Sequence, residues 1–139
     1  MVTIMEEQIK SLDPKLVINK RVDNEKEICI YCERLYENRK VHQTKIREVL
    51  DIPFNGKKVI LFLNVKRFKN DFDENNPRKT ITEQFDFLND TKRRTKRLED
   101  TLYDLTKNQS FKAASEYANK YITNISDDTL INIVLKKTN

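Results

Sequence analysis

The chain has 139 residues, of which 37% are hydrophobic and 35% are charged, and its formal net charge at pH 7 is +5. This length suits one domain with a modest core, and no stretch approaches the roughly eighteen apolar residues of a membrane-spanning helix. Glu6 and Glu7 stand where a secretory signal would be apolar, and two cysteines are too few for a disulfide framework. We therefore expect an intracellular protein, in the cytoplasm or the nucleus, without membrane contact.

The N-terminal third predicts a short helix and a hairpin. Apolar residues at helical spacing predict a helix over 4–12. The β-branched run 16–22 and the alternating run 27–36, separated by four polar residues, predict two antiparallel strands. A helix over 25–35 is the alternative.

The next segment contains a turn with a specific sequence. Apolar residues at helical spacing predict a helix over 43–50, which Pro53 would end. Asn55-Gly56 before a β-rich run predicts a type I′ turn, because both central residues of that turn need positive φ. The run 57–68 is therefore predicted to be a strand, and Pro53, which cannot donate to a ladder, belongs on a sheet edge.

The remaining residues predict a loop and several helices. The polar stretch 70–79 is predicted to be an exposed loop. Residues 80–108 favour a helix too long for a small domain, so it either breaks near Asn89 or projects into solvent. Two further helices are predicted over 111–122 and 127–137, each preceded by a serine suited to cap it.

Together these elements predict an α+β fold in a single domain of residues 1–139. A small N-terminal antiparallel sheet lies in a β-rich, basic half, residues 1–69. A helical C-terminal half follows over residues 80–139.

Positive charge is concentrated in two blocks. Residues 39–69 contain nine basic and two acidic residues, a local charge of +7, and residues 92–97 contribute +5. Clustered cations favour a polyanion because each neutralised phosphate releases condensed counterions, although a solvated surface is the simpler alternative. We therefore predict a protein that binds DNA or RNA. Its predicted phosphate contacts are Lys57, Lys58, Lys66, Arg67, Lys69, Lys92, Arg93, Arg94, Lys96 and Arg97.

The alternative hypothesis is a protein-interaction module, either a subunit of a complex or an inhibitor. Leu98, Leu102 and Leu105 form a stripe at helical spacing that would dock on a protein partner or on a second copy of the chain. Retention of nucleic acid on purification, and its loss at high salt, would distinguish the two hypotheses.

One face of the strand 57–68 also has two possible roles. Ile60, Phe62 and Phe68 share this face with Lys66. Aromatic side chains beside cations are how many single-strand binders stack bases. The alternative, which we favour, is that the C-terminal helices cover this face and place Phe62 in the core.

Motifs for catalysis are lacking in the sequence. With one glycine, a Gly-rich phosphate loop is impossible, and His42 is the only histidine for acid–base or nucleophilic chemistry. Cys29 and Cys32 have the spacing of a zinc knuckle, but with His42 they give three of the four ligands that a structural zinc needs. A strand would place the two cysteines on opposite faces. We predict no enzyme activity, no cofactor and no metal.

Overall fold

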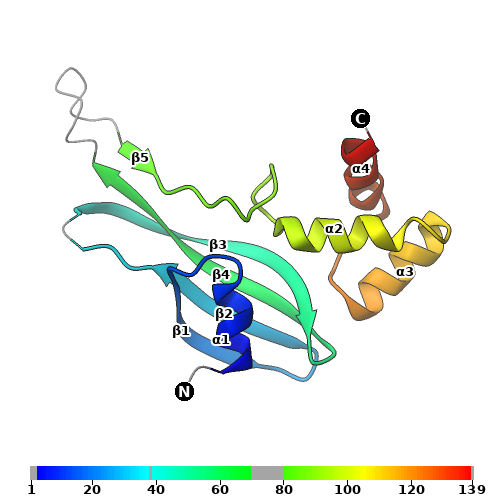
Figure 1. Cartoon of the computed structure of the whole chain (residues 1–139), viewed down its shortest axis with the longest axis horizontal. Helices are drawn as coiled ribbons and strands as arrows, with labels where there is room; N and C mark the ends of the chain where they lie inside the picture. Colours follow the sequence, from blue (N-terminus) through cyan, green and yellow to red (C-terminus); the bar gives the residue numbers. More distant parts are fainter. Residues whose placement is uncertain (1–2, 38, 70–79, 139) are drawn as a thin grey trace.

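The computed structural model describes residues 3–37, 39–69 and 80–138. The predicted loop 70–79 lies outside the described residues. In chain order the elements are α1 (Ile4–Lys10), β1 (Leu16–Asp23), β2 (Glu27–Arg34), β3 (Val41–Phe54), β4 (Lys57–Lys69), β5 (Thr80–Thr82), α2 (Lys96–Leu105), α3 (Phe111–Tyr121) and α4 (Asp127–Thr138). Figure 1 shows the sheet with α1 in one part of the molecule and α2, α3 and α4 gathered beside it. The predicted α+β class, with strands before helices, is confirmed.

Two hairpins lie side by side in the sheet. The strand order is β1-β2-β4-β3, and β5 pairs with the end of β4. The pairs β1–β2, β3–β4 and β4–β5 are antiparallel, whereas β2 and β4 pair in parallel. The predicted hairpin over 16–22 and 27–36 is confirmed, and the alternative helix over 25–35 is not formed. The predicted antiparallel pairing therefore holds for three of the four strand pairs, whereas the parallel pair of β2 and β4 makes the sheet mixed.

The turn between β3 and β4 has the predicted conformation. Asn55 has φ of 50° and Gly56 has φ of 74°. Phe54 and Lys57 are partners on either side of the turn. Pro53 lies on β3, which is an edge strand, as its missing N–H requires.

The predicted helix over 43–50 is wrong, because these residues belong to β3. Their register with β4 is continuous from Gln43, opposite Arg67, to Asp51, opposite Val59. The tight turn at Gly56 brings the segment antiparallel to β4, and cross-strand pairing over this length outweighs a short helical pattern.

The predicted long helix over 80–108 is also wrong. After β5 the chain is irregular until Thr95, whose hydroxyl accepts a hydrogen bond from the Leu98 amide at 3.3 Å and caps α2. Phe85 and Phe87 are buried against the sheet, and this packing keeps the segment extended. Of the residues predicted to be helical here, those from Lys96 to Leu105 form α2.

The last two helices were predicted to within one residue at each end. Ser110 caps α3 by accepting from the Ala113 amide at 3.1 Å, and Ser126 caps α4 by accepting from the Thr129 amide at 3.2 Å. Both serines thus satisfy amides that a helix leaves without an internal partner. Helix α1 was predicted as well. In the described part of the chain, no helix has the length and apolar character needed to cross a bilayer.

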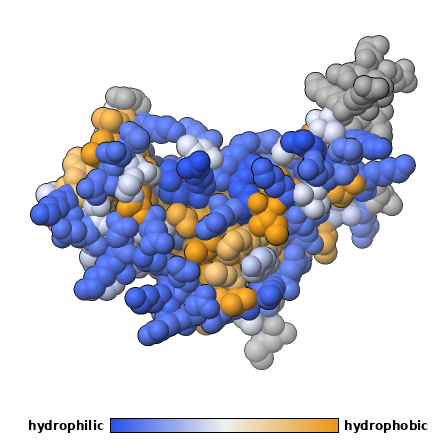
Figure 2. Space-filling model, turned by 180° about the vertical axis from the view of Figure 1, so that it is seen from behind, coloured by the Kyte–Doolittle hydropathy of each residue, from blue (hydrophilic) through white to orange (hydrophobic). Residues whose placement is uncertain are grey.

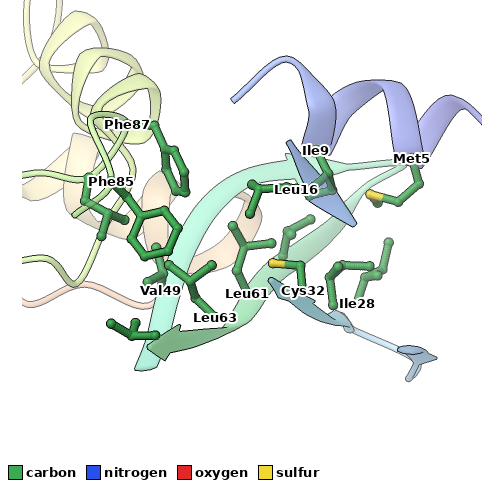
Figure 3. Packing of buried hydrophobic residues seen from close by; sticks show 14 residues of the cluster. Met5, Ile9, Leu16, Ile28, Cys32, Val49, Leu61, Leu63, Phe85 and Phe87 are labelled. Carbon is green, nitrogen blue, oxygen red and sulfur yellow. The ribbon is translucent and has the colours of Figure 1, made fainter. Parts of the chain in front are cut away.

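Buried apolar side chains form two clusters. In the first, side chains of one sheet face pack under α1 and the segment after β5; Figure 3 shows Leu61 and Leu63 between Ile9 on one side and Phe85 on the other. In the second, α2, α3 and α4 pack together around Leu102 and Leu130. Leu50 and Ile52 of β3 pack against this second cluster, so β3 connects the two.

Candidate nucleic-acid interface

Two of the predicted phosphate contacts on β4 instead contact other residues of the protein. The Lys58 Nζ donates to Asn124 Oδ1 at 2.7 Å and to the Asn119 carbonyl. Lys66 is 7% exposed, and its Nζ lies 3.3 Å from a Glu33 carboxylate oxygen. Because both ammonium groups already have protein partners, we remove them from the candidate interface.

Two arginines of the second basic block are also engaged. An Arg94 Nη atom lies 3.3 Å from Glu99 Oε1. Arg97 pairs with Asp51, whose side chain is 1% exposed. These arginines hold α2 to its own loop and to the sheet, and we remove them too.

The other six predicted contacts lie at or near the surface, and they are Lys57, Arg67, Lys69, Lys92, Arg93 and Lys96. The Nζ of Lys57 donates a hydrogen bond to the Asn24 carbonyl at 2.8 Å. Lys57 therefore lies at the end of the sheet where β1 turns into β2. Arg67 and Lys69 lie at the opposite end of β4. The six are therefore not one cluster.

The fold brings basic side chains from both blocks to one place. Arg47 of β3 lines a depression together with Lys92 and Lys96. Arg47 also lines a neighbouring depression with Lys45 and Arg67. We call these five side chains the basic surface. Arg47 is the residue common to both depressions, so the surface is continuous.

The cations of the basic surface are available to a ligand. Among the described residues, none of the five lies within ion-pairing distance of a carboxylate. Glu83, Asp86 and Asp90 also line the depression at Arg47. The Glu83 side chain is 1% exposed and accepts from Tyr36, and Asp90 pairs with Lys136. Asp86 is thus an exposed carboxylate without an ion pair among the described residues, beside the three cations of this depression.

Local structure explains how these cations are positioned. Lys45 lies opposite Val65, and both face the side of the sheet that carries the core. The core ends there, so a long cationic side chain extends into solvent. Lys92 has φ of 60° in a turn that the Asn89 side chain stabilises by accepting from the Arg93 amide at 3.0 Å.

Lys45 and Arg47 are missing from the sequence-based prediction of the site. The predicted helix over 43–50 would have placed them on an unrelated surface. The Asn55-Gly56 turn needs a strand on each side, and this requirement could have identified the segment before it as a strand.

The leucine stripe proposed for partner docking belongs to the core. Leu98 and Leu102 are 0% exposed, and Leu105 is partly buried against the same cluster. The stripe faces α3 and α4 of the same chain, so this face is not available to a partner. Exposed apolar side chains of α3 and α4 lie elsewhere, at Phe111, Tyr117, Tyr121, Ile131 and Leu135.

The other face of the sheet is only partly covered. Ile60 and Phe68 are 8% and 3% exposed, whereas Phe62 is half-buried and stacks on Tyr31 with ring centroids 4.7 Å apart. Neither core cluster includes Phe62, so the predicted burial under the C-terminal helices is wrong. Figure 2, which views the molecule from behind, shows an apolar patch over the strands surrounded by hydrophilic surface.

The cysteines and the histidine do not fit a zinc site. Cys29 is half-buried and Cys32 fully buried, three positions apart on β2, so they point to opposite faces as predicted. Burial raises the pKa of the Cys32 thiol to about 12. Cys29 lies opposite Ile60 of β4. Gln43, the chain neighbour of His42, lies opposite Arg67, which is roughly 23 Å further along β4. Among the described residues, no three side chains of the types that bind metals are grouped together.

One protein family matches part of the chain. Residues 25–69, which comprise β2, β3 and β4, are similar to the zinc-finger of transposase IS204/IS1001/IS1096/IS1165. The match spans less than half of the chain and includes three of the five residues of the basic surface. No curated protein and no solved structure matches. At a coarse level the similarity indicates nucleic-acid binding and is compatible with a non-catalytic role. The description names a zinc-finger, but the residues that the structure describes bring no set of three metal-binding side chains together.

Proposed function

We propose that this protein binds nucleic acid without catalysing a reaction on it, and that the basic surface contacts the phosphates. The observation that carries the proposal is the meeting of Arg47 with Lys92 and Lys96 at one depression. These cations come from two segments separated by more than forty residues. The cost of bringing like charges together is offset when a polyanion occupies the surface.

Charge and similarity both support this proposal. The basic surface holds five cations without an ion pair among the described residues, in a chain whose net charge is +5. Binding at such a surface gains free energy from the release of counterions, which is independent of sequence. The partial match to a transposase zinc-finger covers β3 and β4, the strands that carry Lys45, Arg47 and Arg67.

A second candidate interface for the same ligand lies on α4. Helices α3 and α4 are joined by residues 122–126, and both pack on α2. This connectivity is that of a helix-turn-helix unit, whose second helix enters the major groove. Ile131, Asn132 and Leu135 are exposed along one side of α4. Asn132→Ala weakens binding if this helix contacts bases, and leaves binding unchanged if the basic surface acts alone.

The salt dependence of binding tests the proposal. For the full chain and a short oligonucleotide, the logarithm of the affinity should fall linearly with the logarithm of salt concentration. Changing Arg47, Lys92 and Lys96 together to Gln should reduce the slope by up to about 3, because each phosphate contact contributes about 0.9.

A matched variant controls for the loss of three charges. Lys15, Lys26 and Lys107 are exposed and line neither depression of the basic surface, so changing them to Gln should leave the slope nearly unchanged. If the unmodified protein has no salt-sensitive affinity for single- or double-stranded nucleic acid at micromolar concentration, the proposal is wrong. Equal slopes for the two triple variants would show that the basic surface is not the interface.

A further inference from the structure

The hairpin of β3 and β4 extends beyond the rest of the sheet. The parallel partner β2 pairs with β4 only from Lys58 to Leu63. Past Leu63, β4 continues to Lys69 with β3 on one side and the three-residue β5 on the other. In β3, every residue of 41–46 is exposed. Figure 1 shows this end of the hairpin directed away from the helices. We call residues 41–47 and 64–69 the ribbon.

One face of the ribbon carries five long hydrogen-bond donors around the buried Val65. Gln43 lies directly opposite Arg67 in the register, and both therefore project from the same face. Alternation along the strands adds other residues to this face, namely Lys45, Arg47 and Lys69. Among the described ribbon residues, this face carries no carboxylate, since Glu48 is both beyond the ribbon and on the other face.

From this geometry we infer that the ligand is double-stranded DNA and that the ribbon enters its major groove. The inference rests on the proposed function and specifies the class of nucleic acid. A major groove about 12 Å wide admits a two-stranded ribbon such as β3 with β4. The short β5, which pairs with β4 from Arg67 to Lys69, then lies along the edge of the inserted ribbon. Arg67 and Gln43 contact base edges from the centre of the ribbon face. Lys45, Arg47 and Lys96, along the side of the ribbon that leads to α2, contact phosphates.

The chemistry of the paired residues favours base edges. An arginine guanidinium donates two hydrogen bonds to O6 and N7 of guanine, and a glutamine amide pairs with N6 and N7 of adenine. Gln43, Arg47 and Arg67 are thus the side chains of the ribbon face with this capacity. We assign the base contacts to the paired Gln43 and Arg67, because Arg47 lies beside Lys92 and Lys96, where the ribbon joins the rest of the fold. Lysine, a compact point charge, suits phosphate contacts.

A single strand is a poorer fit to the ribbon face. Single-strand binders need aromatic side chains on which bases stack. Of the described residues on the ribbon face, none is aromatic. The aromatic ribbon residue, Phe68, lies on the other face, is 3% exposed and is covered by the Tyr36 ring at 4.9 Å.

Comparing four ligands with the full chain tests the inference. The ligands are a short DNA duplex, each of its two single strands, and an RNA duplex of the same sequence. The DNA duplex should bind at least about tenfold more tightly than the others, because the major groove of A-form RNA is too deep and narrow to admit the ribbon. Equal or tighter binding of RNA duplex or single strands would overturn the inference and leave the proposed function standing. Absence of binding to all four would overturn both.

Two single substitutions test the assigned contacts. After selection from a random pool of duplexes, Arg67→Ala should lower the preference for the selected sequence by at least about fivefold, since one bidentate base contact carries this much discrimination. Lys45→Gln should weaken binding to all duplexes alike and reduce the salt slope by about one. Lys26→Gln, with a side chain outside the ribbon, is the control. Selection without an enriched sequence, or identical effects of both substitutions, would contradict the base-edge contact.

Discussion

Arg97 of α2 donates a hydrogen bond from Nε to Asp51 of β3 at 2.9 Å, and this ion pair joins the helical half to the sheet. Asp51 is 1% exposed and also accepts from the Thr95 hydroxyl at 2.7 Å. The same guanidinium reaches the Ser11 hydroxyl at 2.8 Å, just after α1. A single arginine thus connects α1, β3 and α2.

Arg97→Gln should therefore destabilise the protein by about 3 kcal/mol, because it leaves a buried carboxylate without its cation. Chemical denaturation measures this change. Arg93→Gln is the control, since Arg93 is exposed four residues earlier and should cost less than about 0.5 kcal/mol. Adding Asp51→Asn to Arg97→Gln should restore part of the loss by removing the buried charge. Equal stabilities of the two arginine variants would show that the ion pair does not join the two halves.

The turn between β3 and β4 gives a second prediction. At Gly56, φ is 74°, and apart from the glycine and its two chain neighbours no residue has an atom within 4 Å of the position a Cβ would occupy, so the cost of substitution is conformational. Gly56→Val should destabilise the protein by more than about 1 kcal/mol, because a β-branched residue at positive φ is strained.

Gly56→Asn serves as the comparison, since asparagine tolerates positive φ far better than valine. It should retain most of the stability in the same denaturation experiment. If valine left the melting temperature unchanged, positive φ at this position would not matter to folding, and the type I′ assignment would lose its support.

Metal independence is a third prediction. Chelation with EDTA should leave the melting temperature unchanged, and elemental analysis should find no stoichiometric zinc. Cys29→Ser should fold normally because Cys29 is half-buried outside the core. Cys32→Ser should cost about 1–3 kcal/mol because it buries a hydroxyl at a core position that is 0% exposed. One tightly held zinc per chain, or equal effects of both substitutions, would contradict the geometry of β2.

Local features of the fold were predictable from the sequence. The Asn55-Gly56 turn and the serine caps of α3 and α4 depend on residues a few positions apart, and all of them form as expected. In contrast, the apolar side chains of residues 43–50 have helical spacing, yet the segment forms a strand. The choice is made by β4, which the turn folds back onto them.

The total charge of each basic block was predictable, but which of its cations form ion pairs within the protein was not. The block 92–97 has five cations in six residues, yet Arg97 serves the ion pair with Asp51, whereas Lys96 remains exposed one residue earlier. Asp51 is 46 positions away in the chain. Such a partner is defined by tertiary packing, so the sequence alone could not separate structural from available cations.

The stacked pair of Tyr31 and Phe62 provides the last prediction, which separates the two faces of the sheet. Their rings are 4.7 Å apart at an interplanar angle of 14°, on the face opposite the basic surface. Each ring is half-buried by the other and by the strands around it, so the pair stabilises the sheet.

Tyr31→Leu and Phe62→Leu should each lower stability by about 1 kcal/mol, because an aromatic pair contributes roughly this much beyond its buried area. Neither should change the affinity for a DNA duplex or for its single strands, since the proposed contacts lie on the other face. Had the pair served to stack bases, each substitution would weaken single-strand binding by about 1–3 kcal/mol. Measuring affinity and stability on the same two variants therefore decides whether this aromatic face binds bases or holds the sheet together.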